Sequence, residues 1–121
     1  MLIRVGVCCA ASALAVAGCG SADAPTASRP AAPGLSIDIR IAGGAVTPTN
    51  ATLQATVGEP ITLHVDSDAA DELHVHSVPE HEFEVEAKPG QSFDFSVSVP
   101  GSVEVELHHL NRTVATIHVG P

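Results

Sequence analysis

The residues best suited to do chemistry lie in one short stretch, residues 71–76 (DELHVH), which otherwise has the pattern of a buried strand. Successive side chains of a strand point to opposite faces, so His74 and His76 would share one face and the apolar residues beside them the other. Imidazole nitrogens are common metal ligands, and carboxylates lie close by in the sequence. This histidine pair is the most site-like feature of the chain.

The elements that must position this pair are strands. From Leu35 onward, apolar and polar residues alternate in short runs, with turn signals about every ten residues. The runs are 37–41, 53–57, 61–65, 73–75, 83–85, 93–99, 103–107 and 115–119. No stretch shows a helical period. Seven or eight short strands predict an all-β fold, an antiparallel Greek-key sandwich or a barrel.

Composition excludes several classes of function. The 121 residues leave room for one domain, and 14 acidic against 5 basic residues give a formal net charge of −9. Such a charge argues against binding to nucleic acid and against electrostatic docking on anionic lipid. The chain has no Trp or Tyr and only three Phe, which argues against base stacking and aromatic sugar platforms.

Residues 1–18 have the features of an export signal. Arg4 provides the positive start, and residues 5–17 form an apolar run that is too short to span a bilayer comfortably. The run ends in VAGC at residues 16–19, which resembles the bacterial lipobox. The resemblance implies a lipoprotein: cleavage before Cys19, lipid on its sulfur, and a domain anchored on the extracytoplasmic side of the cell membrane. The alternative is an ordinary secretory signal without lipid.

The expected order along the chain is signal peptide (1–18), lipidated cysteine and Pro/Ala-rich linker (19–34), and folded domain (35–121). The linker lacks apolar periodicity and is typical of a semi-extended tether. Cys8 and Cys9 leave with the signal, and Cys19 would carry lipid. The mature domain therefore has no thiol, so we expect neither a disulfide nor a thiolate metal ligand.

Several short motifs follow one another in a set order: VGEPITL (57–63), DELHVH (71–76), KPGQ (88–91), SFDF (92–95) and PGSVEVELH (100–108). This series resembles the cupredoxin-like domains of bacterial envelope proteins over about residues 35–119. In that family a cysteine follows the Pro-Gly turn, but here Leu107 stands in its place. Blue-copper electron transfer requires a thiolate ligand, so the resemblance implies the fold without that activity.

In a cupredoxin arrangement, strand 71–76 approaches the end of strand 103–107. The resemblance thus implies one metal site built from imidazoles of both: His74, His76 and His108. Nearby carboxylates would be oxygen ligands or hydrogen-bond partners of the imidazoles: Glu72 and Glu106. Two further imidazoles are additional candidates: His81 and His109. Imidazole with carboxylate and no sulfur suits Cu(II), with Zn(II) as the alternative.

Two functions of different class stay open. The first is an anchored domain that binds or buffers copper through these histidines. The second is a metal-free structural or interaction domain that serves an envelope protein partner, with no cofactor, in which the histidines are a hydrogen-bonded polar face. The acidic run 80–86 (EHEFEVE) is interpreted as a solvated strand face that guards against edge pairing. Because no nucleophile elbow, phosphate loop or zinc-protease helix motif occurs, we expect no enzyme activity.

Overall fold

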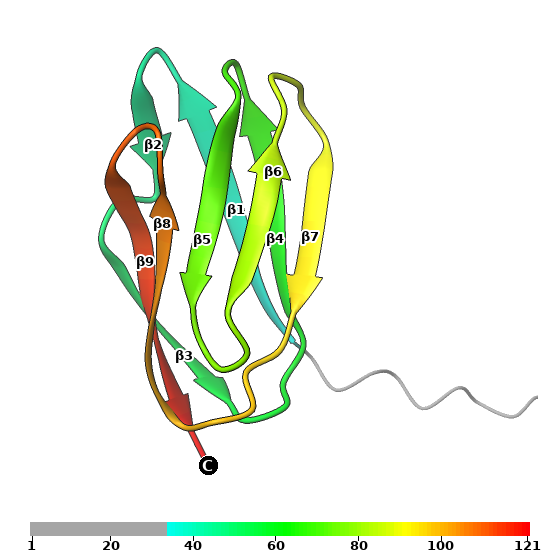
Figure 1. Ribbon diagram of the computed structural model, residues 1–121, viewed down its shortest axis with the longest axis vertical. Coiled ribbons are helices and arrows are strands. Elements are labelled where there is room, and N and C mark those ends of the chain that lie inside the picture. Colours follow the sequence, from blue (N-terminus) through cyan, green and yellow to red (C-terminus); the bar gives the residue numbers. More distant parts are fainter. Residues whose placement is uncertain (1–33) are drawn as a thin grey trace, which may run out of the picture.

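The computed structural model describes residues 34–121, which form nine strands in two sheets (Figure 1). In chain order the strands are β1 (Leu35–Ala42), β2 (Ala45–Thr47), β3 (Ala51–Thr56), β4 (Ile61–Ser67), β5 (Asp71–His76), β6 (His81–Val85), β7 (Gln91–Phe95), β8 (Gly101–Leu107) and β9 (Arg112–Gly120). No helix in this part of the chain is long and apolar enough to cross a membrane. The predicted signal peptide, Cys19 and the linker up to residue 33 lie outside the described residues.

The all-β sandwich predicted from the alternating pattern is confirmed, with one strand more than expected. Each of the eight predicted runs contributes a strand, and β2 is the additional one. Gly43 and Gly44 adopt positive φ angles of 58° and 74°, which suit a tight hairpin turn. The chain therefore folds back at once, and β2 pairs with the end of β1.

The sheet pairing is mixed, which corrects the expectation of a purely antiparallel sandwich. The four-stranded sheet has the order β2-β1-β4-β7, and the five-stranded sheet has the order β3-β9-β8-β5-β6. The pairs β1–β4 and β3–β9 are parallel, and the other pairs are antiparallel. Between β1 and β4 the chain crosses to the other sheet as β3, and such crossovers allow parallel neighbours.

The core lies between the two sheets and consists of alternate residues from nearly every strand. The largest fully buried side chains include Ile61, Leu63, Leu73, Leu107 and Ile117. Burial of each such side chain contributes about 1.5–3 kcal/mol. This burial also fixes the register of β5, because a slip by one residue would move its apolar side chains to the solvent and its histidines into the core.

Candidate metal centre

His74 and His76 lie together on the outer face of β5. Leu73 and Val75 alternate with them and are 0% exposed, so the predicted division between two faces is present. The centroids of the two imidazole rings are 4.2 Å apart. The side chain of His74 is 19% exposed and that of His76 is 43% exposed, so both imidazoles are accessible from the solvent.

The third member of the cluster is Glu80, which comes from the turn between β5 and β6. One ligand atom from each of His74, His76 and Glu80 lies within 4.8 Å of the others. Glu80 Oε1 accepts a hydrogen bond from His74 Nε2 and lies 3.9 Å from His76 Nδ1. Sequence reasoning placed Glu80 on a solvated strand face and missed this role. Its place four residues after His76, just before the chain returns as β6, was the available signal.

Glu106 on β8 holds the ring of His76. In the β5–β8 register Glu106 lies opposite His74, and its Oε2 accepts a hydrogen bond of 2.9 Å from His76 Nε2. Its Oε1 accepts a bond of 3.4 Å from the hydroxyl of Thr113 on β9. A β-bulge at Val114 shifts the β8–β9 register and puts Thr113 opposite Glu106. The predicted carboxylate partner is therefore anchored on both of its oxygens.

His108 lies at the border of this cluster and is turned toward another carboxylate. Its ring centroid is 6.4 Å from that of His74, and its Nδ1 lies 3.2 Å from Glu72 Oε1. With a side chain that is 69% exposed, it lines the same pocket of about 350 Å³ as His74, His76 and Glu106. The strand end of β8 thus approaches β5, but His108 pairs with Glu72 instead of joining the three-residue cluster.

His109 and His81, the two additional candidates, lie apart from the cluster. The side chain of His109 is 71% exposed, and its Nδ1 is 4.0 Å from Asp71. His81 shares the inward face of β6 with Phe83 and stacks on it with ring centroids 5.9 Å apart. The ring of His81 also lies 5.4 Å from that of Phe95. Its Nε2 is buried and has no hydrogen-bond partner among the described residues.

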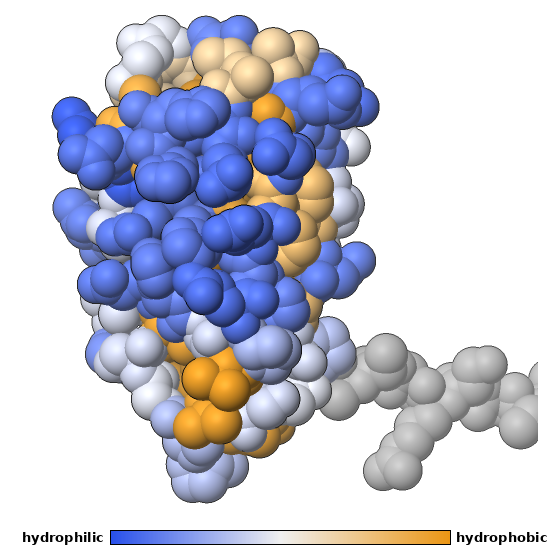
Figure 2. Space-filling model, in the orientation of Figure 1, coloured by the Kyte–Doolittle hydropathy of each residue, from blue (hydrophilic) through white to orange (hydrophobic). Residues whose placement is uncertain are grey.

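Carboxylates surround the cluster on the outer face of the five-stranded sheet. Cross-strand register places Glu72 opposite Glu84, His74 between Glu82 and Glu106, and His76 opposite Glu104. Figure 2 shows hydrophilic side chains covering this face over β5 and β6. A dense negative charge of this kind attracts cations and favours metal ions over anionic ligands. Residues 34–121 carry thirteen acidic and three basic side chains, a formal net charge of −10.

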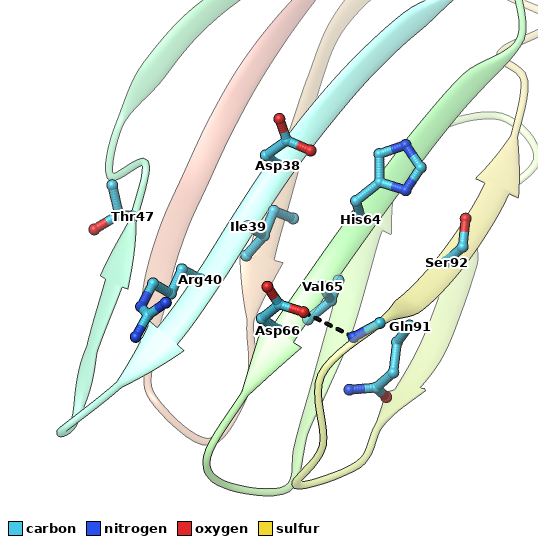
Figure 3. A pocket seen from close by; sticks show the side chains of 10 residues that line it. Asp38, Ile39, Arg40, Thr47, His64, Val65, Asp66, Gln91 and Ser92 are labelled. Carbon is cyan, nitrogen blue, oxygen red and sulfur yellow. Dashed lines mark hydrogen bonds between the residues drawn. The ribbon is translucent and has the colours of Figure 1, made fainter.

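A second concavity, of about 380 Å³, lies on the outer face of the other sheet (Figure 3). Asp38, His64 and Ser92 stand in one cross-strand row, and Asp66 accepts a hydrogen bond from the backbone N–H of Gly90. The three side chains of that row are all exposed, and no hydrogen bond joins them. With a single imidazole, this surface has fewer nitrogen ligands to offer a metal than the surface of β5.

Comparisons with known proteins place the fold. No known sequence-family profile matches the chain, and no curated protein matches it either. Among solved structures, a reduced variant of amicyanin is similar at 18% identity, with a TM-score of 0.50, over 74% of this chain and 85% of that one. The Cu(I) form of another amicyanin variant is 19% identical over the same shares, with a TM-score of 0.49. The domain has a cupredoxin-like fold. At these identities the similarity concerns the fold alone.

Proposed function

We propose that this protein is a cell-envelope lipoprotein whose cupredoxin-like domain binds or buffers a divalent metal ion at His74, His76 and Glu80. Cu(II) is the first candidate and Zn(II) the second. The observation that carries the proposal is the meeting of two imidazoles and one carboxylate with ligand atoms within 4.8 Å of one another. Two nitrogens and an oxygen, without sulfur, form a donor set that suits these ions.

The hydrogen bonding around His76 supports a ligand role for its other nitrogen. A metal-bound imidazole usually donates its free ring N–H to a carboxylate, which fixes the tautomer and the ring orientation. Here His76 Nε2 donates to Glu106, and His76 Nδ1 faces Glu80 at 3.9 Å. Metal–nitrogen bonds are about 2.0–2.1 Å long, so small side-chain rotations bring these atoms to bonding distance.

The donor set favours holding an ion over electron transfer. Residues 34–121 contain no cysteine, and a blue-copper site takes one of its ligands from a thiolate. Glu80 is 58% exposed and lies in a surface turn, so an ion bound there can exchange with the solvent. Exchange and an acidic surround suit a buffering role, and we propose binding without catalysis.

The proposed location rests on the sequence before the domain. The lipobox-like VAGC at residues 16–19 supports lipid attachment at Cys19, and two or three acyl chains give stable anchoring. The Pro/Ala-rich residues that follow support a tether. The domain would then lie on the extracytoplasmic side of the membrane. Thiols are prone to form disulfides there, so a metal site without cysteine ligands suits that location.

A metal-free interaction domain is the second candidate, and the hydrogen bonding favours it in one respect. Each of the three imidazoles in question already has a carboxylate partner: His74 with Glu80, His76 with Glu106 and His108 with Glu72. These pairs satisfy the polar face without an ion. In that case the domain serves an envelope protein partner, and no metal is bound in fixed ratio.

Titration with Cu(II) and Zn(II) separates the two candidates. The purified chain should bind one ion, and this binding should depend on the side chains of His74 and Glu80. The double variant His74→Ala, His76→Ala should lose the site. His118→Ala is the matched control, because His118 is an exposed histidine of the same sheet that pairs with Ser102. Undiminished binding in the double variant, or equal loss in the control, refutes the site. If the wild-type chain binds no ion, the metal-free function stands.

A further inference from the structure

Charged side chains are unevenly distributed over this strongly acidic domain. Residues 41–58 hold no charged side chain, although residues 34–121 carry a net charge of −10. This uncharged segment forms β2 and β3, which are edge strands of the two sheets. Both lie on the opposite side of the molecule from β6 and β7, the other two edges (Figure 1). One side of the sandwich therefore has two edge strands that carry no charged side chain of their own.

The outer edge of β3 is open to pairing. Among the described residues β3 bonds only to β9, in parallel register. Val57 N donates to Gly120 O, and the backbone groups of successive strand residues point alternately to the two sides of the strand. The odd-numbered residues of β3 therefore face β9, whereas Thr52 and Gln54 turn their backbone N–H and C=O groups away from it. Their side chains are exposed as well. At the end of the strand the free N–H of Thr56 is capped by Glu59 Oε2 at 2.7 Å.

Natural proteins protect exposed edge strands against pairing with another chain, most often by charge or by short length. Here β6 carries Glu82 and Glu84, β7 carries Asp94, and β2 has only three residues. The six-residue β3 (ATLQAT) has neither protection along its middle. An unprotected edge strand on a highly charged domain is a surface that another chain can cover by strand pairing.

We propose that β3 pairs in antiparallel register with β3 of a second copy of this chain, centred on Leu53. In that register Thr52 faces Gln54 of the partner subunit, and Gln54 faces Thr52 of the partner subunit. The outward N–H and C=O groups then exchange hydrogen bonds in two pairs. The Glu59 cap on Thr56 confines the pairing to the middle of the strand. The two five-stranded sheets become one continuous sheet.

The absence of charged side chains from residues 41–58 makes this edge the place where a second copy of the acidic domain can approach, and the net charge sets how the contact responds to salt. Two domains of −10 each repel one another, and the repulsion is weakest where the facing surfaces carry no charge. The contact itself involves backbone groups and neutral side chains. Added salt screens the repulsion between the copies but leaves these hydrogen bonds, so the dimer should become more stable as ionic strength rises. A contact made by ion pairs would show the opposite dependence.

The test is the mass of the purified full-length chain in detergent, measured by sedimentation equilibrium with EDTA present. EDTA removes any metal ion that could bridge the histidines of two copies, so the outcome does not depend on the proposed function. We expect a dimer whose population grows between about 50 mM and 500 mM salt. Gln54→Pro removes the outward N–H without touching the hydrogen bonds to β9, and Thr52→Asp adds charge to the edge; both should be monomeric.

Ser92→Asp is the matched control for Thr52→Asp, because it adds the same charge to the edge strand β7 and should leave the dimer intact. Circular dichroism tests whether each variant is folded. If Gln54→Pro does not fold, the result for Thr52→Asp decides the question. A wild-type chain that stays monomeric up to about 100 μM at every salt concentration overturns the proposal. A dimer that persists in the folded edge variants also overturns it, because the contact then lies elsewhere.

Discussion

Asp71 ties the start of β5 to the loop between β8 and β9, and its removal should destabilise the whole domain. The residue is 5% exposed. Its Oδ1 accepts hydrogen bonds from the backbone N–H groups of Glu72 at 2.7 Å and His109 at 2.8 Å. Its Oδ2 accepts one from Leu110 at 3.1 Å. One buried carboxylate therefore satisfies three backbone donors from two segments.

The size of the effect follows from these bonds. Hydrogen bonds to a charged group contribute about 1.5–3 kcal/mol each. In Asp71→Asn one carbonyl oxygen remains for Glu72 and His109, but without the full charge. The new amide group then faces the N–H of Leu110, donor against donor, and leaves a buried group unsatisfied. We expect a loss of about 2–3 kcal/mol in the free energy of unfolding.

Urea denaturation of the purified chain measures this loss as a lower midpoint at unchanged slope. The matched control is Asp94→Asn, because Asp94 accepts one hydrogen bond, from the hydroxyl of Thr62, at an exposed position. Its cost should stay within about 0.5 kcal/mol. Should Asp71→Asn cost no more than Asp94→Asn, the buried carboxylate does not hold the loop. Metal affinity should be unchanged in both variants, since neither side chain contacts the His74–His76–Glu80 cluster.

Three further predictions concern the site and the core. Glu106→Gln weakens the orientation of His76 and should lower metal affinity about 10–100-fold, measured by titration; an unchanged affinity would show that Glu106 does not orient a ligand. Affinity for Cu(II) should fall as the pH is lowered, because protonated imidazole cannot bind a metal; binding that is independent of pH would exclude histidine ligands. Leu73→Ala should cost about 2–5 kcal/mol of stability in urea denaturation, because the side chain is 0% exposed; the exposed Val99→Ala is its control, and equal small losses would contradict the assigned β5 register.

The alternation of apolar and polar residues was enough to predict most of the fold. Leu73 and Val75 bracket His74, so their burial alone assigns the two imidazoles of β5 to one outer face. The physical reason is local: a strand has a side-chain period of two, and the apolar set must face the core. β2 was not predicted, because three residues are too few to show a period of two. The two glycines before it did indicate a turn at which the chain reverses direction.

Pairing between strands could not be predicted in the same way. The parallel neighbours β1–β4 and β3–β9 depend on which sheet each strand joins, and a pattern of alternation carries no information on that choice. His81 shows the limit within one strand. The run 80–86 reads as an acidic stripe, but its odd-numbered members face inward, where His81 lies against Phe83 and Phe95.

The sequence by itself determined that two imidazoles share an accessible face and that residues 34–121 contain no thiol, because both follow from residue type and the period of a strand. Only the tertiary structure decided what joins them. The turn after β5 brings in Glu80, and a bulge in β9 sets Thr113 against Glu106. His108, though close in space, turns to Glu72. These contacts arise from turn geometry and cross-strand register, which depend on the packing of the whole sandwich.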